Sequence, residues 1–328
     1  MNLISRLISL FTPAPPLTPD ALAGLQRIGE LVSSTLVMEP DFDAKLAQPV
    51  AHARAYCHDM IDALPPSIQI DRASFSTDPL VHALFATADD IGAMVAASKS
   101  VREYLAEPDS WQEDSFFALM AARRMEKKVL GVALEGNMLT SGVPQSLLQF
   151  SNQMLVFPAH DPVAARAALF NAGYDSLLRT FAQHVYQVHE EYKSLKTERE
   201  MERARLLSLP PHQREAFPPR RIAELDERLH KQFASIQPGS LVQALADFLA
   251  KPDLALHLAS VRLWITRSGV VYNEAGHPDT EAINFTELYS RDRRHHVVLP
   301  VRIRTQEARE ALTRAQEERV AHENILLI

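Results

Sequence analysis

Residues 162–209 carry the longest helical pattern in the chain, and its length constrains the fold more than any other feature. A helix rises about 1.5 Å per residue, so this one would span roughly 70 Å, more than the diameter of a compact domain of this size. Apolar residues recur in it at alternating spacings of three and four, which is the seam pattern of a coiled coil. The predicted seam positions are Leu178, Phe181, Val185, Val188, Tyr192 and Leu195.

A second amphipathic stretch, residues 220–236, follows after a loop that has a proline pair at each end. Helices joined by a short loop usually pack antiparallel. We therefore predict a long antiparallel coiled-coil hairpin, in which Tyr192 lies opposite Ile236 and Leu195 lies opposite Phe233. The predicted seam positions of the second helix are Ile222, Leu225, Leu229, Phe233 and Ile236.

The first helix also contains His184, His189 and Glu190, which resemble the motif of a zinc-binding helix. In that motif the two histidines are four residues apart and share one face of the helix. Here they are five apart, which places them roughly 140° from each other around the helix. They cannot chelate one ion, and we predict no metal site.

Glycine is scarce, with ten residues in 328, and the chain contains none of the usual glycine motifs for dinucleotide binding, phosphate binding or a nucleophilic serine. Cys57 is the only cysteine, so neither an internal disulfide nor a cysteine-based zinc site can form. We predict no cofactor.

The predicted fold is α+β and predominantly α-helical, with small antiparallel sheets in addition to the long hairpin. We expect five consecutive regions along the chain. They are an amphipathic segment with a proline-rich linker (1–17), an acidic helical region (18–126), a small β region (127–161), the helical hairpin (162–237) and a C-terminal α+β unit (238–328).

The C-terminal region contains two runs with the alternation of a half-buried strand. Residues 261–265 form the first run, and a turn at 267–269 is expected to reverse the chain after it. Residues 297–303 form the second run, which Pro300 interrupts. Because proline cannot donate a ladder hydrogen bond, we predict an edge strand or a bulge there.

Polar side chains gather among the predicted strands of the small β region. A carboxylate with a nearby imidazole could act as general acid and base, with amides orienting a substrate. The same groups could instead occupy the solvent faces and turns of antiparallel strands, and we favour that interpretation and assign no catalytic residue. The candidate pocket residues are Glu135, Asn137, Gln145 and His160.

A second cluster is rich in arginine and falls on one face of the C-terminal strands. Guanidinium groups and an indole on one sheet face could bind an anion or stack a nucleotide base. Residues 256–328 contain ten basic and ten acidic side chains, however, so we favour a solvated face of mixed charge. The candidate residues are Arg262, Trp264, Arg294, His296, Arg302 and Arg304.

The formal net charge of −7 comes from the N-terminal third of the chain. Residues 1–110 contain 7 Lys and Arg against 14 Asp and Glu, and the rest contains 27 of each. Phosphate groups would be repelled by this acidic region, so we predict no strong nucleic-acid binding.

The first residues place five apolar side chains on one side of a possible helix. This segment could dock on the body of the protein or on a partner, or it could contact a membrane surface. No apolar run approaches the roughly 18 residues of a transmembrane helix, and we predict neither a signal peptide nor a location outside the cytoplasm. The five side chains are Leu3, Ile4, Leu7, Ile8 and Phe11.

These patterns favour a non-enzymatic protein-interaction or regulatory protein. It would use the coiled-coil hairpin to bind a protein partner or a second copy of itself. The alternative is an enzyme or a small-ligand sensor with a pocket in residues 128–161.

Overall fold

The protein is described here from a computed structural model, and the chain divides into two compact units, each built from two separate segments. Unit 1 comprises Met1–Tyr56 and Tyr174–Pro252, and unit 2 comprises Cys57–Gly173 and Asp253–Ile328. This division differs from the five consecutive regions predicted from the sequence. The residues that the structure describes are 18–111, 113–135, 138–210, 220–272, 274, 277, 279–291 and 295–326.

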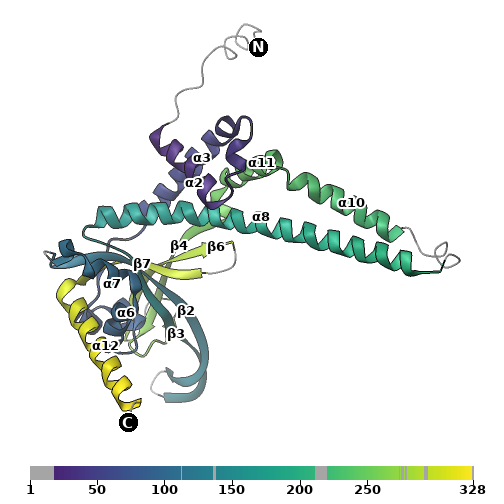
Figure 1. Ribbon diagram of the computed structural model, residues 1–328. Helices are drawn as coiled ribbons and strands as arrows, with labels where there is room; N and C mark the ends of the chain where they lie inside the picture. The colour runs from purple at the N-terminus through teal and green to yellow at the C-terminus, as the bar shows by residue number, and fades with distance from the viewer. Residues whose placement is uncertain are drawn as a thin grey trace, which may run out of the picture. The chain divides into compact units, whose positions relative to one another are not determined.

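The protein is α+β and mostly helical, as predicted (Figure 1). Unit 1 contains helices only among its described residues. They are α2 (Pro19–Leu31), the short η1 (Leu36–Met38), the first part of α3 (Phe42–Asp62), most of α8 (Pro162–Ser208), α10 (Arg220–Ser235) and α11 (Pro238–Leu249).

Close packing of α2 against α3 and α8 organises unit 1. A Cβ atom at Gly24 would lie 2.5 Å from a methyl group of Val50, so only glycine allows this approach. Tyr174 of α8 is 1% exposed, and its hydroxyl donates a hydrogen bond to the Gly24 carbonyl oxygen at 3.1 Å. Arg54 forms an ion pair with Asp20 beside this contact. A buried hydroxyl with a backbone partner fixes the position of α8 on the other two helices.

Unit 2 is built on one seven-stranded sheet with the strand order β3-β2-β7-β6-β4-β5. The seventh strand, β1, pairs in parallel with β7, and the other pairs are antiparallel. The strands are β1 (Ile68–Gln69), β2 (Ser115–Glu135), β3 (Met138–Ala159), β4 (Leu256–Thr266), β5 (Val271–Tyr272), β6 (Thr280–Ser290) and β7 (His295–Arg304).

The single sheet corrects the prediction of separate small sheets. It forms because β2 pairs with β7 over eight residues, from Ser115 opposite Arg304 to Ala122 opposite Val297. β2 begins at Ser115, inside the stretch that the sequence pattern assigned to helices. Alternation in β2 is hard to recognise from sequence, because half of its inward positions are alanine.

Pro300 lies neither on an edge strand nor at a bulge, the two predicted alternatives. β7 has neighbours on both sides, and its pairing with β2 runs through Pro300 without a register shift. On one side β6 pairs with residues 295–298 of β7, and β1 pairs with Val301 and Arg302. Pro300 falls in the gap between these two neighbours. Its missing N–H group therefore interrupts neither ladder.

The sheet curves so far that β3, at one edge, contacts the turn before β5, at the other edge. Left-handed backbone at Asn152 (φ 54°) and Phe157 (φ 54°) accompanies register shifts along β3, and such bulges increase the bend of a strand. Leu148 N then donates to the Gly269 carbonyl oxygen at 2.8 Å, next to an isolated bridge between Leu147 and Val270. The turn before β5 is thereby joined to β3.

One apolar core fills the inner face of the curved sheet. Four short helices and the longer α12 (Thr305–Leu326) pack on it, together with residues from β2 to β7. The short helices are α4 (Arg72–Thr77), α5 (Pro79–Leu84), α6 (Asp89–Ala97) and α7 (Lys99–Ala106). Two single turns, η2 (Pro108–Trp111) and η3 (Pro252–Leu254), contribute none of their described side chains to this core. The fully buried members of the core include Val81, Val101, Phe116, Met120, Val297 and Val301.

We expect Gly269→Ala to lower the free energy of unfolding more than Gly142→Ala does. Both glycines have positive φ, at 85° and 79°, where alanine costs about 1 kcal/mol. A Cβ atom at Gly269 would also lie 3.2 Å from the Leu148 carbonyl oxygen, whereas Gly142 has open space around it. Chemical denaturation of the two variants measures the difference, and equal losses would contradict a role of Gly269 in closing the sheet.

Candidate functional site

Helices α8 and α10 lie side by side in unit 1 through a small apolar cluster. Among the described residues of both helices, the buried members of this cluster are Leu195, Leu225 and Leu229, with Tyr192 packed against them. The Gln232 side chain donates to the Val188 carbonyl oxygen at 3.3 Å at one end of the contact. The two helices therefore run antiparallel, with a narrow apolar contact.

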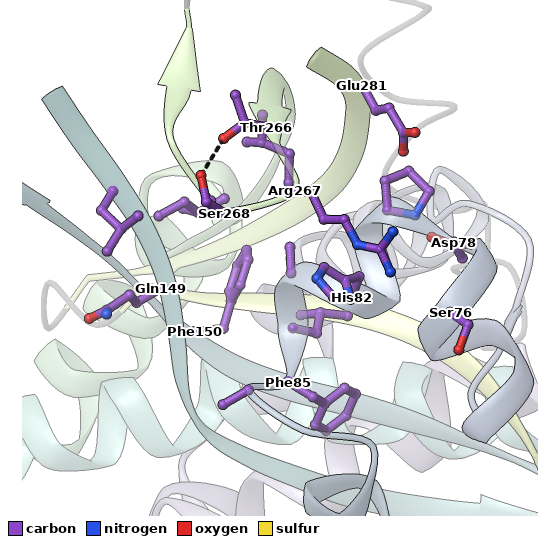
Figure 2. A pocket seen from close by; sticks show the side chains of 18 of the residues that line it. Ser76, Asp78, His82, Phe85, Gln149, Phe150, Thr266, Arg267, Ser268 and Glu281 are labelled. Carbon is purple, nitrogen blue, oxygen red and sulfur yellow. Dashed lines mark hydrogen bonds between the residues drawn. The ribbon is translucent and has the colours of Figure 1, made fainter. Parts of the chain in front are cut away.

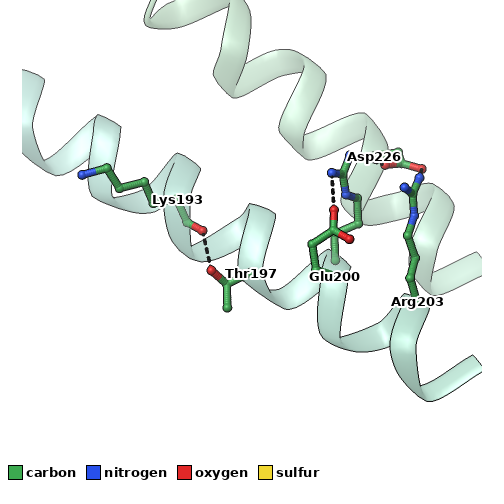
Figure 3. Close-up of polar contacts among 6 residues, drawn as sticks. Lys193, Thr197, Glu200, Arg203 and Asp226 are labelled. Atoms are coloured by element: carbon green, nitrogen blue, oxygen red, sulfur yellow. Dashed lines mark hydrogen bonds and ion pairs between the residues drawn. The ribbon is translucent and has the colours of Figure 1, made fainter. Parts of the chain in front are cut away.

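Ion pairs extend the contact toward the end of α8 (Figure 3). Asp226 of α10 lies 3.4 Å from the Arg199 guanidinium and 3.5 Å from that of Arg203. Arg221 forms a further ion pair with Glu198. These side chains are partly exposed, and ion pairs of this kind contribute little to stability in water.

The register of the two helices differs from the predicted one by about one helical turn. Tyr192 packs near Phe233, with ring centroids 6.1 Å apart, and Leu195 lies in the cluster of Leu225 and Leu229. The prediction had placed Tyr192 opposite Ile236. Because seam positions alternate at spacings of three and four residues, a shift by one turn again brings seam positions opposite each other. The apolar periodicity alone is therefore compatible with either register. In the observed register Asp226 pairs with Arg199 and Arg203, and Arg221 pairs with Glu198.

The remaining predicted seam residues have different surroundings. Leu178, Phe181 and Val185 are buried, and Phe181 packs against Phe248 of α11 with ring centroids 5.6 Å apart. Phe233, by contrast, is 50% exposed. Three further seam positions, Val188, Ile222 and Ile236, are half-buried.

Unit 2 contains a cavity of about 570 Å³ where α4 and α5 face β3 and the turn between β4 and β5 (Figure 2). Its apolar lining includes Phe85, Phe150 and Ile265. Its polar lining includes Ser76, Asp78, His82, Gln149, Arg267, Ser268, Asp279 and Glu281. The cavity brings together both signs of charge beside aromatic rings.

Of the four candidate pocket residues, the two with described side chains, Gln145 and His160, do not line this cavity. The Gln145 side chain crosses to the neighbouring strand and donates to the Val132 carbonyl oxygen at 3.0 Å. His160 Nε2 lies 2.7 Å from a carboxylate oxygen of Asp161, which also accepts hydrogen bonds from the first backbone N–H groups of α8. Glu135 ends β2, its side chain lies outside the description, and Asn137 is outside the described residues.

Three of the candidate anion-binding residues contact groups of their own chain. Arg302 donates to the Ser115 hydroxyl at 2.8 Å, and Arg304 forms ion pairs with Asp71 and Glu307. Arg262 lies over the Trp264 ring, 5.1 Å from its centroid. His296 sits on β7 opposite Leu288, and Arg294 is outside the described residues.

The structure also shows a buried carboxylate that the sequence analysis missed. Glu287 is 1% exposed, lies 3.2 Å from the Arg124 guanidinium and accepts a hydrogen bond from the Tyr289 hydroxyl at 2.7 Å. This hydrogen bond, together with burial, raises the pKa of Tyr289. His257 and His295 pack on either side of the Tyr289 ring. The sequence signal that could have revealed this buried carboxylate is a glutamate at an inward position of a strand with alternating polarity.

No protein-family model, curated protein or solved structure matches the chain. In the described part of the chain, no helix is long and apolar enough to cross a membrane. Nor do three or more His, Cys, Asp or Glu side chains come together there as a metal site would require. The arrangement of the described side chains is therefore the basis for any functional proposal.

We expect the Asp71 carboxylate to make unfolding depend on pH. Burial alone would raise its pKa, but hydrogen bonds from Ser74 and the charge of Arg304 outweigh burial and lower it. A group with a lowered folded pKa stabilises the protein above its unfolded pKa of about 3.9, and this contribution is lost as the pH falls through the folded pKa. Asp71→Asn should therefore cost about 2 kcal/mol at neutral pH and much less in acid.

Urea unfolding of the native chain and of Asp71→Asn at neutral and acidic pH measures this difference. Asp62→Asn is the matched control, because the Asp62 side chain is 77% exposed and its ion pair with Arg166 is 3.5 Å long. A loss at Asp71 that stays constant with pH would show that the charge does not matter.

Proposed function

We propose that this is a non-enzymatic protein-interaction or regulatory protein, and that its binding element is a coiled-coil hairpin of α8 and α10. The supporting observation is how little these helices bury against each other. Among their described residues, three leucines form the buried cluster, although α8 is 47 residues long. An isolated pair of helices with so small an apolar contact gains stability by covering further surface.

Exposed aromatic side chains support a protein as the partner. Phe233 is 50% exposed next to Tyr192, and Tyr186 is 65% exposed on α8. Aromatic residues are enriched in protein interfaces and contribute much of their binding energy. A second copy of the chain or a foreign protein could supply the complementary surface.

Charge in the hairpin is mixed, which favours protein over nucleic acid. Residues 196–235 contain nine Lys and Arg and seven Asp and Glu. Binding to a phosphate backbone depends on a basic excess, which this stretch lacks. The apolar positions Leu3, Ile4, Leu7, Ile8 and Phe11 are outside the described residues, so membrane-surface contact through them stays a prediction from the sequence.

A small-ligand sensor is the second candidate function, and the cavity in unit 2 favours it. Its wall includes residues 147–151 of β3, which belong to the region where the sequence suggested a pocket. Its volume lies within the range of roughly 300–1,000 Å³ that is typical of small-molecule sites. For both candidates we propose a cytoplasmic location, which fits a chain with a single cysteine.

We expect a shortened hairpin to leave the protein folded and to abolish its association. Deleting residues 200–221 and joining Arg199 to Ile222 through a short Gly–Asn turn keeps the cluster around Leu195 and Leu225. Sedimentation equilibrium of the full chain should show a dimer that this deletion converts to a monomer. If the full chain is monomeric, cross-linking in extracts of its native host should show a protein adduct that the deletion removes.

Point variants distinguish specific association through the hairpin from nonspecific association through any exposed apolar side chain. Phe233→Ser removes an exposed aromatic side chain and should weaken association as the deletion does. Leu254→Ser is the matched control, because it removes an apolar side chain that is 70% exposed outside the hairpin. Association that survives both hairpin variants, or a deletion that unfolds the whole protein, would refute the proposal.

A further inference from the structure

The cavity in unit 2 combines an apolar wall, one guanidinium group and a set of carboxylates. We propose that it binds a small zwitterion, a molecule with a carboxylate, an ammonium group and an apolar body, such as a free apolar amino acid. This inference rests on the second of the two proposed functions and is independent of the hairpin. It assigns a ligand class from the groups that line the cavity.

The apolar wall would hold the body of the ligand. Phe85 is 4% exposed and Ile265 is 4% exposed, and both line the cavity. Phe150 also lines the cavity (Figure 2) and is held edge-on against the Phe285 ring, with centroids 5.7 Å apart. A wall of fixed aromatic and aliphatic groups removes an alkyl or aryl side chain from water.

Arg267 would bind the carboxylate of the ligand. It stands on the turn between β4 and β5, and Figure 2 shows its guanidinium group extending into the cavity toward His82 and Asp78. Among the residues that the structure describes, Arg267 forms no ion pair. The turn itself is fixed, because Leu148 N donates to Gly269 O and Gly269 N donates to Thr266 O, each at 2.8 Å. A guanidinium group can hold a carboxylate with two parallel hydrogen bonds.

The ammonium group would bind the carboxylates of the cavity. Asp78 caps α5 through Oδ1, which accepts from Leu80 N at 2.8 Å and Val81 N at 3.2 Å. Asp279 and Glu281 lie on the rim beside the start of β6. With His82 neutral, three carboxylates and one guanidinium give the lining a formal charge of −2. A simple anion would be repelled, and a simple amine would leave Arg267 without a counter-ion.

Calorimetric titration of the native chain tests the proposal with leucine and two analogues. Leucinamide lacks the carboxylate, and 4-methylpentanoate lacks the ammonium group. Each charged contact in a partly enclosed site contributes about tenfold to affinity. We therefore expect leucine to bind at least about tenfold more tightly than either analogue, and methionine and phenylalanine to show the same preference over theirs.

Two variants connect each contact to its side chain. Arg267→Gln should remove the preference for leucine over leucinamide and keep the preference over 4-methylpentanoate. The double variant Asp279→Asn, Glu281→Gln should do the reverse, and it spares the helix-capping Asp78. Arg262→Gln is the matched control, because Arg262 lies on the same strand β4 outside the cavity, over Trp264. It should leave all three affinities unchanged.

Several results would overturn the zwitterion site. One is the absence of millimolar binding by leucine, methionine and phenylalanine to the native chain. Another is equal affinity of the native chain for leucine and for its two analogues. This comparison does not depend on whether any variant folds. A thermal-shift screen with amines, phosphates and nucleotides shows whether only the zwitterion proposal is wrong or the ligand-sensor function as well. Stabilisation by one of those compounds alone would keep a ligand-binding function and refute the zwitterion.

Discussion

The antiparallel ladder between β2 and β7 is the interaction on which the rest of unit 2 depends. It joins the hairpin of β2 and β3 to the four strands β4 to β7 from the end of the chain, and it aligns the inward rows of both. Phe116 lies opposite Ile303 and Met120 opposite Leu299, and all four side chains are at most 2% exposed. Burial of these rows, at about 25 cal/mol per Å² of apolar surface, stabilises a pairing whose loop-closure entropy is large.

The curvature of the sheet follows from that pairing and creates the cavity. Once β2 and β7 are joined, bulges in β3 bend its outer part until Leu148 meets Gly269. The turn that carries Arg267 is then held against β3, and α4 and α5 close the remaining side. The same inward face holds Glu287, whose carboxylate is partnered by Arg124 and Tyr289. The Tyr289 hydroxyl donates to one carboxylate oxygen, and the charge of Arg124, 3.2 Å from the other, offsets the cost of burying the carboxylate.

Unit 1 obeys a different constraint. Its helices are fixed at one end by the contact of Gly24 with Tyr174, where a buried hydroxyl bonds to the backbone. Further along α8 the apolar contact narrows to the cluster around Leu195. Asp226 forms ion pairs with Arg199 and Arg203 there, and these add little stability. So weak a contact supports the proposal that this element completes its burial on another surface.

The sequence by itself determined what depends on neighbours along the chain. The length of α8, the amphipathic α10 and the turn before β5 all follow from periodicity and turn residues within a few positions. The ladder of β2 and β7 could not be predicted, because alanines at Ala118 and Ala122 hide the alternation of β2 and because the pairing joins distant segments. The helix register was ambiguous for a heptad pattern, and the cavity residues Asp78, Arg267 and Glu281 lie too far apart in sequence to form a motif. Tertiary structure decided these features, because contacts between distant residues are selected by the burial and charge pairing of the whole unit.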